Sequence, residues 1–234
     1  MSLLTLCQDV CAAVNLPRPA AIVGSSDDTA RKLLSLAQEE LRSLAAAGQW
    51  QELTKEGTFA SVNGTESYAL STIASDLDYI VSDTLWNRTL REPVKGPLTS
   101  QEWQAQKSFA TTSPFKQFRV VGGAILLYPT PTEAHNYAFD YITKNRCQSA
   151  GGTAQERWQA DTDTSVIDEF VVFLGLRYRL LKSIGMAYAD EFAEYEAERD
   201  KRLGRTKVAP TLQMRPGVNF RAGVAVPEGN WPVS

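Results

Sequence analysis

The sequence predicts an α+β fold: a mainly α-helical bundle, built from a long N-terminal helix and a C-terminal helical hairpin, with an inserted antiparallel β-rich region and an extended C-terminal arm. Three observations predict it. Apolar residues recur at helical spacing near both ends of the folded part, alternate in the middle, and lie among prolines and glycines at the C-terminal end. These patterns are typical of helices, strands and irregular chain. We therefore expect the bundle to comprise 1–50 and 164–204, the β-rich insertion 51–163 and the arm 205–234.

The N-terminal region predicts two helices. A short helix over 2–15 ends before Pro17 and Pro19, because a proline disfavours the helical conformation in the residue before it. A long amphipathic helix follows, with Ser26 as its expected N-cap and Gly48 as its stop.

The middle of the chain predicts short antiparallel strands. Asn63-Gly64 and Gly122-Gly123 are typical of tight hairpin turns. We therefore expect 56–62 to pair with 66–70, and 118–121 to pair with 124–128. An extended stretch is expected over 78–95, and a short helix over 99–108 opens with the capping box Thr99 to Glu102. A strand is expected over 137–144, with Tyr137, Phe139 and Tyr141 on one face. Residues 145–165 are expected to form a long loop.

The C-terminal part of the folded region predicts a helical hairpin. Apolar spacing indicates helices over about 165–183 and 187–203, with a break at Gly185. The first should present Val166, Ile167, Phe170, Leu174, Tyr178 and Leu181 as its apolar face. The second carries Glu191, Glu194, Glu196 and Glu198, which we interpret as a solvated face. If several copies lined a channel, these carboxylates would form an acidic wall that repels DNA phosphates.

The arm is defined by its composition. Prolines and glycines occur throughout 205–234 at a density that excludes a helix and a packed core. Its net charge is +3, which leaves −6 for the rest of a chain whose net charge is −3. Apolar residues spaced along an extended segment are typical of peptides that bind in a groove of another chain. The expected partner-binding residues are Arg205, Lys207, Leu212, Met214, Arg215, Val218, Phe220, Arg221, Val224, Val226 and Trp231.

Composition narrows the class of protein. The pI of about 5.4 does not suit a sequence-specific DNA-binding protein. No apolar run approaches the roughly 18 residues that cross a bilayer, so we expect no membrane contact. Residues 1–14 lack the basic start of a signal peptide. Three cysteines without framework spacing indicate synthesis in a reducing cytoplasm.

Residues able to perform chemistry are few. His135 is the one histidine, and we interpret it as an exposed loop residue. The three cysteines and this histidine lack zinc-ligand spacing, and Cys7 and Cys11 lie four apart on an apolar helix side, where packing is the expected role. Cys147 has no other cysteine or histidine near it in the sequence. We expect no catalytic, cofactor-binding or metal-binding residues, and hence no enzyme.

A cluster of carboxylates offers the enzymatic alternative. Asp161, Asp163, Asp168 and Glu169 surround the start of a predicted helix, and paired carboxylates serve glycoside hydrolases. Capping of the helix by Asp163 and Asp168 is the simpler interpretation.

Two runs mix aromatic and basic side chains, at 86–91 and at 115–119. Such a mixture could stack nucleic-acid bases. In an acidic chain, strand packing with cation–π contacts is the preferred interpretation.

Several short motifs resemble sequences of the head-to-tail adaptor proteins of tailed bacteriophages, the group that includes connector, tail accessory and head completion subunits. The motifs are LCQDVC at 6–11 with LPRP at 16–19, WNRT at 86–89, GPLTSQEW at 96–103, LYPTPT at 127–132, YITKN at 141–145 and ADTDT at 160–164. The resemblance spans about 1–205 and is weaker in the arm.

This resemblance implies a structural virion protein at the head–tail junction, made in the host cell cytoplasm. It implies a ring of twelve copies that docks on the portal protein, contacts a tail nozzle or tube protein, and lets double-stranded DNA pass without reading its sequence. A tail-tube, stopper or head-completion subunit is the structural alternative. A cell-wall hydrolase using Asp161, Asp163 or Glu169 is the enzymatic one.

Overall fold

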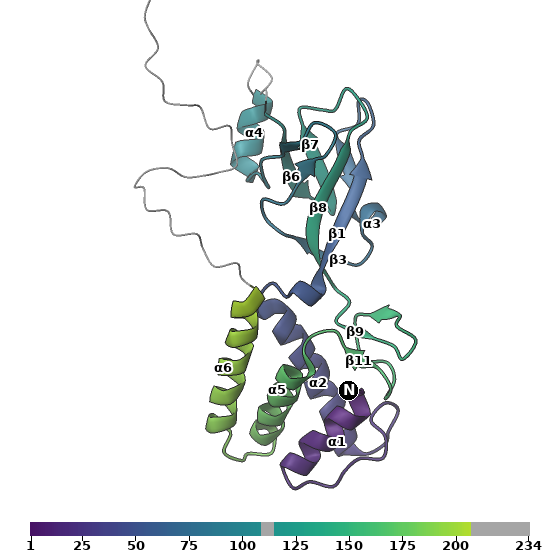
Figure 1. Cartoon of the computed structure of the whole chain (residues 1–234), viewed down its shortest axis with the longest axis vertical. Coiled ribbons are helices and arrows are strands. Elements are labelled where there is room, and N and C mark those ends of the chain that lie inside the picture. The colour runs from purple at the N-terminus through teal and green to yellow at the C-terminus, as the bar shows by residue number, and fades with distance from the viewer. Residues whose placement is uncertain (109–114, 207–234) are drawn as a thin grey trace, which may run out of the picture.

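The computed structural model describes residues 1–108 and 115–206, with the side chains of Arg205 and Thr206 excepted. Helices and antiparallel sheets are combined in this part of the chain, so the expected mixture of α and β structure is confirmed. Figure 1 shows two lobes, one formed mainly by helices and the other mainly by strands.

The helical lobe contains α1 (Leu3–Ala13), α2 (Asp28–Ala47), α5 (Glu169–Ser183) and α6 (Ala189–Thr206). Their apolar sides bury a cluster rich in leucine, valine and alanine. The expected long N-terminal helix is confirmed as α2. Its N-cap is Asp27, not Ser26, because the Asp27 carboxylate accepts a hydrogen bond from Ala30 N at 3.1 Å.

The β lobe holds two antiparallel sheets. The larger orders its strands β1 (Thr54–Ala60), β8 (Asn136–Thr143), β4 (Trp86–Asn87) and β5 (Glu92–Pro93), and β3 (Leu77–Ile80) also pairs with β8. The smaller orders β2 (Ser67–Ala69), β7 (Ala124–Tyr128) and β6 (Gln117–Val121). Two helices, α3 (Leu70–Ile73) and α4 (Ser100–Ser108), accompany them, and the 3-10 turn η1 (Gln51–Leu53) leads from the helical lobe into β1.

The hairpin expected at Asn63-Gly64 is wrong. A turn does form there, since Gly64 has a φ of 75° and Thr65 N donates to Val62 O. Yet β1 pairs with β8, whereas β2 pairs with β7 in the other sheet. Pairing with β8 places Phe59 opposite Tyr137, and burial of these rings outweighs the local preference of the turn.

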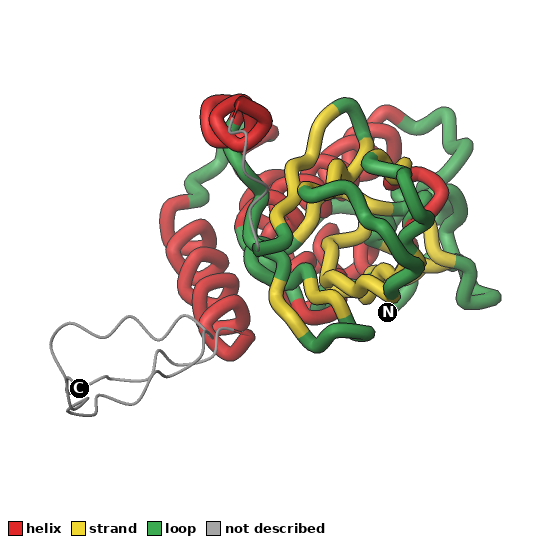
Figure 2. The backbone as a smooth tube through the Cα atoms, turned by 90° about the horizontal axis from the view of Figure 1, so that it is seen from above, coloured by secondary structure: helices red, strands yellow, loops and turns green. Residues whose placement is uncertain are grey.

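The loop expected over 145–165 is also wrong in part. It contains a three-stranded sheet of β9 (Cys147–Gln148), β10 (Ala154–Gln155) and β11 (Thr164–Ser165). Strands of two residues have no detectable period. Cys147 and Trp158 from this segment join the cluster of the helical lobe. The N-terminus lies beside β11 (Figure 1), where Ser2 bridges to Thr164, and Figure 2 shows it next to a strand.

Other predictions are confirmed. β6 and β7 form the hairpin around Gly122-Gly123. The α4 capping box is complete, because Thr99 N donates to Glu102 Oε2 at 2.8 Å and Glu102 N donates to Thr99 Oγ1 at 3.3 Å. β8 buries its aromatic face.

The helical hairpin is confirmed, with three corrections. Helix α5 begins at Glu169, so Val166 and Ile167 precede it. Phe170 is 47% exposed and does not belong to the buried face. Helix α6 continues past Gly204 to Thr206.

Candidate interaction surfaces

The predicted partner-binding residues lie at or beyond the end of α6. The backbone of Arg205 belongs to the last turn of this helix, which corrects the predicted start of the arm. The others, from Lys207 to Trp231, lie outside the described residues. The structure therefore describes the last turn of α6, at which the arm begins; we call this turn, from Arg202, the root of the arm.

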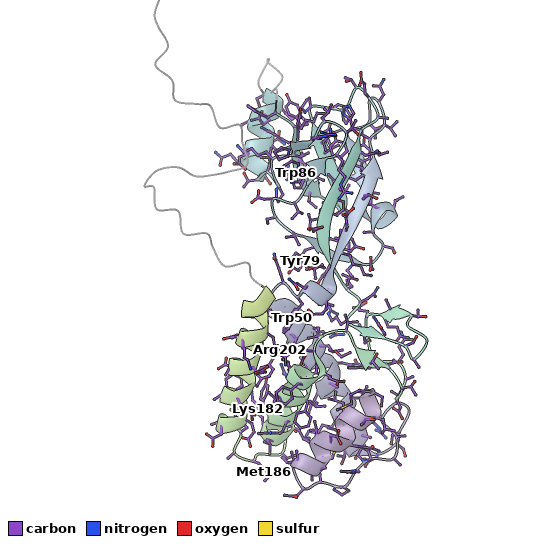
Figure 3. The ribbon with its side chains drawn as sticks, viewed as in Figure 1. Trp50, Tyr79, Trp86, Lys182, Met186 and Arg202 are labelled. Carbon is purple, nitrogen blue, oxygen red and sulfur yellow. The ribbon has the colours of Figure 1, made fainter. Side chains whose placement is uncertain are left out.

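This root is firmly held. Leu203 packs so closely on Gly48 that a Cβ added there would lie 2.9 Å from Leu203 Cδ2. The preceding residue, Arg202, forms ion pairs with Asp168 at 2.6 Å and Glu198 at 2.8 Å. These contacts fix the end of α6 near Trp50, between the two lobes (Figure 3).

The acidic residues of α6 form ion pairs with neighbouring cations. Arg177 of α5 lies 3.6 Å from Glu191 and 3.2 Å from Glu194, and Glu198 is also bound by Lys201 at 2.9 Å. Hydrogen bonds from Arg202 and Lys201 lower the pKa of Glu198. The interleaved cations reduce the negative potential that this face can present.

The carboxylate cluster has structural contacts. Asp161 accepts hydrogen bonds from Ile22 N and Val23 N, the latter at 2.7 Å, and Asp163 accepts from Gln159 N and Ala160 N. Asp163 is buried and caps a turn, so its expected role at the helix start is wrong.

Asp168 does cap α5, accepting from Phe170 N and Val171 N, as predicted. Glu169 pairs with the N-terminal amine of Met1. All four carboxylates of the cluster are thus engaged, and the geometry offers little support for a hydrolase.

The interpretation of His135 as an exposed residue is wrong. Its side chain is only 12% exposed. Its Nδ1 lies 3.3 Å from Asn87 Nδ2 and 3.2 Å from Lys116 Nζ. The nearby Ser61 Oγ donates to Glu133 O and accepts from His135 N, so this hydroxyl serves the turn.

The cysteines are buried, which confirms the packing role expected of Cys7 and Cys11. Burial, with smaller contributions from Cys11 and Asp161, raises the pKa of Cys7 to about 12. Burial likewise raises the pKa of Cys147 to about 12. These two thiols therefore stay protonated at neutral pH and are poor nucleophiles.

The two aromatic and basic runs meet at His135, which Asn87 and Lys116 both contact, but the surface around the first run carries mixed charge. Trp86 is 39% exposed on the β lobe (Figure 3), and Arg88 pairs with Glu56 at 2.8 Å. Both line a shallow depression of about 540 Å³ together with Asp83 and Asp140. The two carboxylates beside the Arg88 guanidinium make this depression unsuited to phosphate groups.

Several cation–π contacts within the described ranges arise elsewhere. They include Lys107 over Trp103 and Tyr128, and Arg199 over Tyr195. Residues 86–91, all of them described, form none of these contacts.

The described residues hold neither a metal-ligand cluster nor a membrane-spanning helix. No three His, Cys, Asp or Glu side chains come together there as metal ligands would. No helix in the same ranges is both long and apolar enough to span a membrane.

Residues 1–220 match the family model of the SU10 adaptor protein. Because the match covers most of the chain, the protein belongs to the SU10 adaptor protein family, a family of phage head–tail adaptors. No curated protein matches the chain.

The family assignment supports an adaptor role in the virion and contacts with portal and tail components. Sequence reasoning found this role through motifs without chemical meaning. It missed the ion pairs that anchor the end of α6, because a helix face shows in sequence which residues are charged but not which neighbours they meet.

Proposed function

We propose that the protein forms a ring of twelve copies that docks on the portal and connects it to the tail. The family match over residues 1–220 carries this proposal. In this arrangement the helices of 1–50 and 164–204 act as one bundle into which the β-rich part of 51–163 is inserted. The C-terminal arm then binds the portal protein.

The arm suits such a contact for two reasons. Its root is fixed by Leu203 and Arg202, so the arm leaves the body at a defined place. Its net charge of +3 and spaced apolar residues favour an acidic, grooved partner surface. A ring offsets the entropy lost on ordering each arm, because many weak contacts act together.

DNA passage through the ring is the second part of the proposal. A body with a net charge of −6 repels phosphates on average, which keeps the DNA from binding to the channel wall. The DNA therefore moves through without its sequence being read.

Removal of residues 207–234 tests the role of the arm. We expect a folded protein that no longer forms a complex with the portal, measured by circular dichroism and by size-exclusion chromatography of the mixture. Replacing Leu212, Met214 and Phe220 by serine should weaken docking strongly. Replacing the polar neighbours Thr211, Gln213 and Asn219 by serine is the matched control. Normal docking by the shortened chain contradicts the proposal.

The same mixing experiment with tail proteins addresses the alternative. A tail-tube, stopper or head-completion subunit would form its complex with tail components and not with the portal.

A further inference from the structure

Strand β1 forms an open edge of the larger sheet. It has one neighbouring strand in the described part of the chain, β8. Strand β6, also at a sheet edge, is different, because Phe118 N donates to Lys95 O and Leu98 N donates to Phe118 O. Thus residues 95–98 cover β6, whereas β1 presents the longer open edge.

The unpaired backbone groups of β1 can be identified from the register. Ser61 N donates to His135 O at 2.8 Å, so odd-numbered residues of this strand bond to β8. The N–H and C=O groups of Glu56, Thr58 and Ala60 therefore point away from β8. All three residues are exposed, and within residues 1–108 and 115–206 these backbone groups have no hydrogen-bond partner.

An open edge of this kind is a template for one more strand. The arm contains a segment whose sequence has the matching period. Between Pro216-Gly217 and Pro227, every second residue from Val218 to Val226 is apolar, and the residues between them are Asn219, Arg221, Gly223 and the small Ala225. The apolar set is Val218, Phe220, Ala222, Val224 and Val226.

This segment starts close enough to reach β1 within one molecule. Helix α6 ends beside the base of β1 (Figure 1), where Leu203 packs on Gly48. Twelve residues from Thr206 to Val218 span at most roughly 40 Å. Strand β1 itself is only about 23 Å long.

The two faces of the segment complement the two faces of β1. Phe59 lies on the core face, half-buried, next to the aromatic cluster. The apolar side chains of the arm segment would cover the exposed part of the Phe59 ring. On the opposite face, Glu56 is 47% exposed and would meet Arg221.

We infer that, in the chain before it meets the portal, the 218–226 segment pairs with the outer edge of β1 of the same chain as an added strand. The inference goes beyond portal docking, because it gives the arm a binding site on its own body. Strand addition satisfies the backbone groups of Glu56, Thr58 and Ala60, and it shields an edge that would otherwise invite association between copies.

Residue-resolved hydrogen exchange of the full chain tests the inference. The amides of Glu56, Thr58 and Ala60 should be protected in the intact protein. The double substitution Phe220→Pro with Arg221→Pro removes backbone donors from the segment, and should speed their exchange about tenfold or more. Gln213→Pro with Met214→Pro, in the same arm but outside the segment, should leave the protection unchanged.

The odd-numbered amides of Lys55, Gly57 and Phe59 report on the fold, because they bond to β8 and should stay protected in every variant. Equal exchange of the even-numbered amides in all three proteins overturns the inference. Protection that rises with protein concentration also overturns it, in favour of an arm donated by a second copy.

Charge reversal provides an independent test of the register. Arg221→Glu should speed exchange at Thr58 and Ala60 because it places like charge beside Glu56, whereas Arg215→Glu makes the same charge change outside the segment and should have little effect. Equal exchange in the two variants contradicts the proposed register.

Discussion

The cluster inside the helical lobe is built mainly from leucine, valine and alanine, whereas the cluster in the β lobe centres on Phe118, Tyr137, Phe139 and Tyr141. The helical lobe also encloses a charge. Glu40 of α2 is fully buried and pairs with Arg179 of α5, which is 13% exposed. A Cβ added at Gly175 would lie only 2.1 Å from Glu40 Oε1, so this glycine makes room for the carboxylate.

In the β lobe, a carboxylate at the base joins the strands. Asp76 accepts hydrogen bonds from Lys55, Tyr141 and Thr143, at 2.7 to 2.8 Å. This carboxylate joins β1 to β8 close to the helical lobe. The difference teaches that the helical lobe depends on an ion pair inside its core. The β lobe depends on the packing of aromatic rings and on the Asp76 carboxylate, which anchors the strands.

The largest expected effect comes from breaking the buried pair in the helical lobe. Arg179→Met leaves the Glu40 carboxylate buried without its cation, and should lower the free energy of unfolding by about 3–5 kcal/mol. Urea unfolding followed by circular dichroism measures the loss. Arg177→Met is the matched control on the same helix. Its partners Glu191 and Glu194 are more exposed, so the loss should stay below about 1 kcal/mol. Equal losses contradict the difference between buried and surface pairs.

The anchor of the β lobe should respond to acid. Burial alone would raise the pKa of Asp76, but hydrogen bonds from Lys55, Thr143 and Tyr141 outweigh it and hold the pKa below its usual range. The ionised carboxylate therefore stabilises the fold above the ordinary Asp value of about 3.9, and this stabilisation is lost as the pH falls below it.

Asp76→Asn should accordingly cost about 1.5–3 kcal/mol at pH 7 and make stability less sensitive to acid. Unfolding curves between pH 7 and pH 2 measure both effects. Asp78→Asn is the control, because Asp78 has only a long contact to Arg146 at 3.9 Å. An unchanged acid profile in Asp76→Asn would remove this carboxylate as the anchor.

Ring packing in the β lobe gives the smallest expected effect. A Cβ at Gly57 would lie 2.8 Å from Phe139 Cζ, so Gly57→Ala must displace a buried ring at a cost of about 1–3 kcal/mol. Gly151→Ala is the control, since its nearest neighbour would be Ser149 Oγ at 3.8 Å. Amide exchange in β8 should increase only for Gly57→Ala. Faster exchange in α2 to the same extent would show that the two clusters do not respond separately.

Local signals in the sequence identified the elements that depend on neighbours along the chain. Helix α2, the α4 capping box and the β6–β7 hairpin are confirmed because each is specified within a few residues. The pairing of the strands could not be predicted as well from the sequence. The turn at Asn63-Gly64 exists, but β1 pairs with residues more than 70 positions away, where long-range ring burial decides.

The same division holds for the surfaces. Composition alone singled out the arm, and the arm's partner residues remain a prediction. The positions of Glu40 and His135 could not be inferred, because a charged residue on a helix and a histidine in a turn look solvent-exposed in sequence until a neighbouring element covers them.

By itself the sequence determined the mixture of helices and strands, the sparse chemistry and the basic, alternating pattern of the arm, because each follows from residue type and spacing. Only the tertiary structure decided that β1 is an open edge, that Glu40 is buried opposite Gly175 and that α6 ends beside β1. Those features depend on which distant segments pack together, and packing is set by the burial of whole faces.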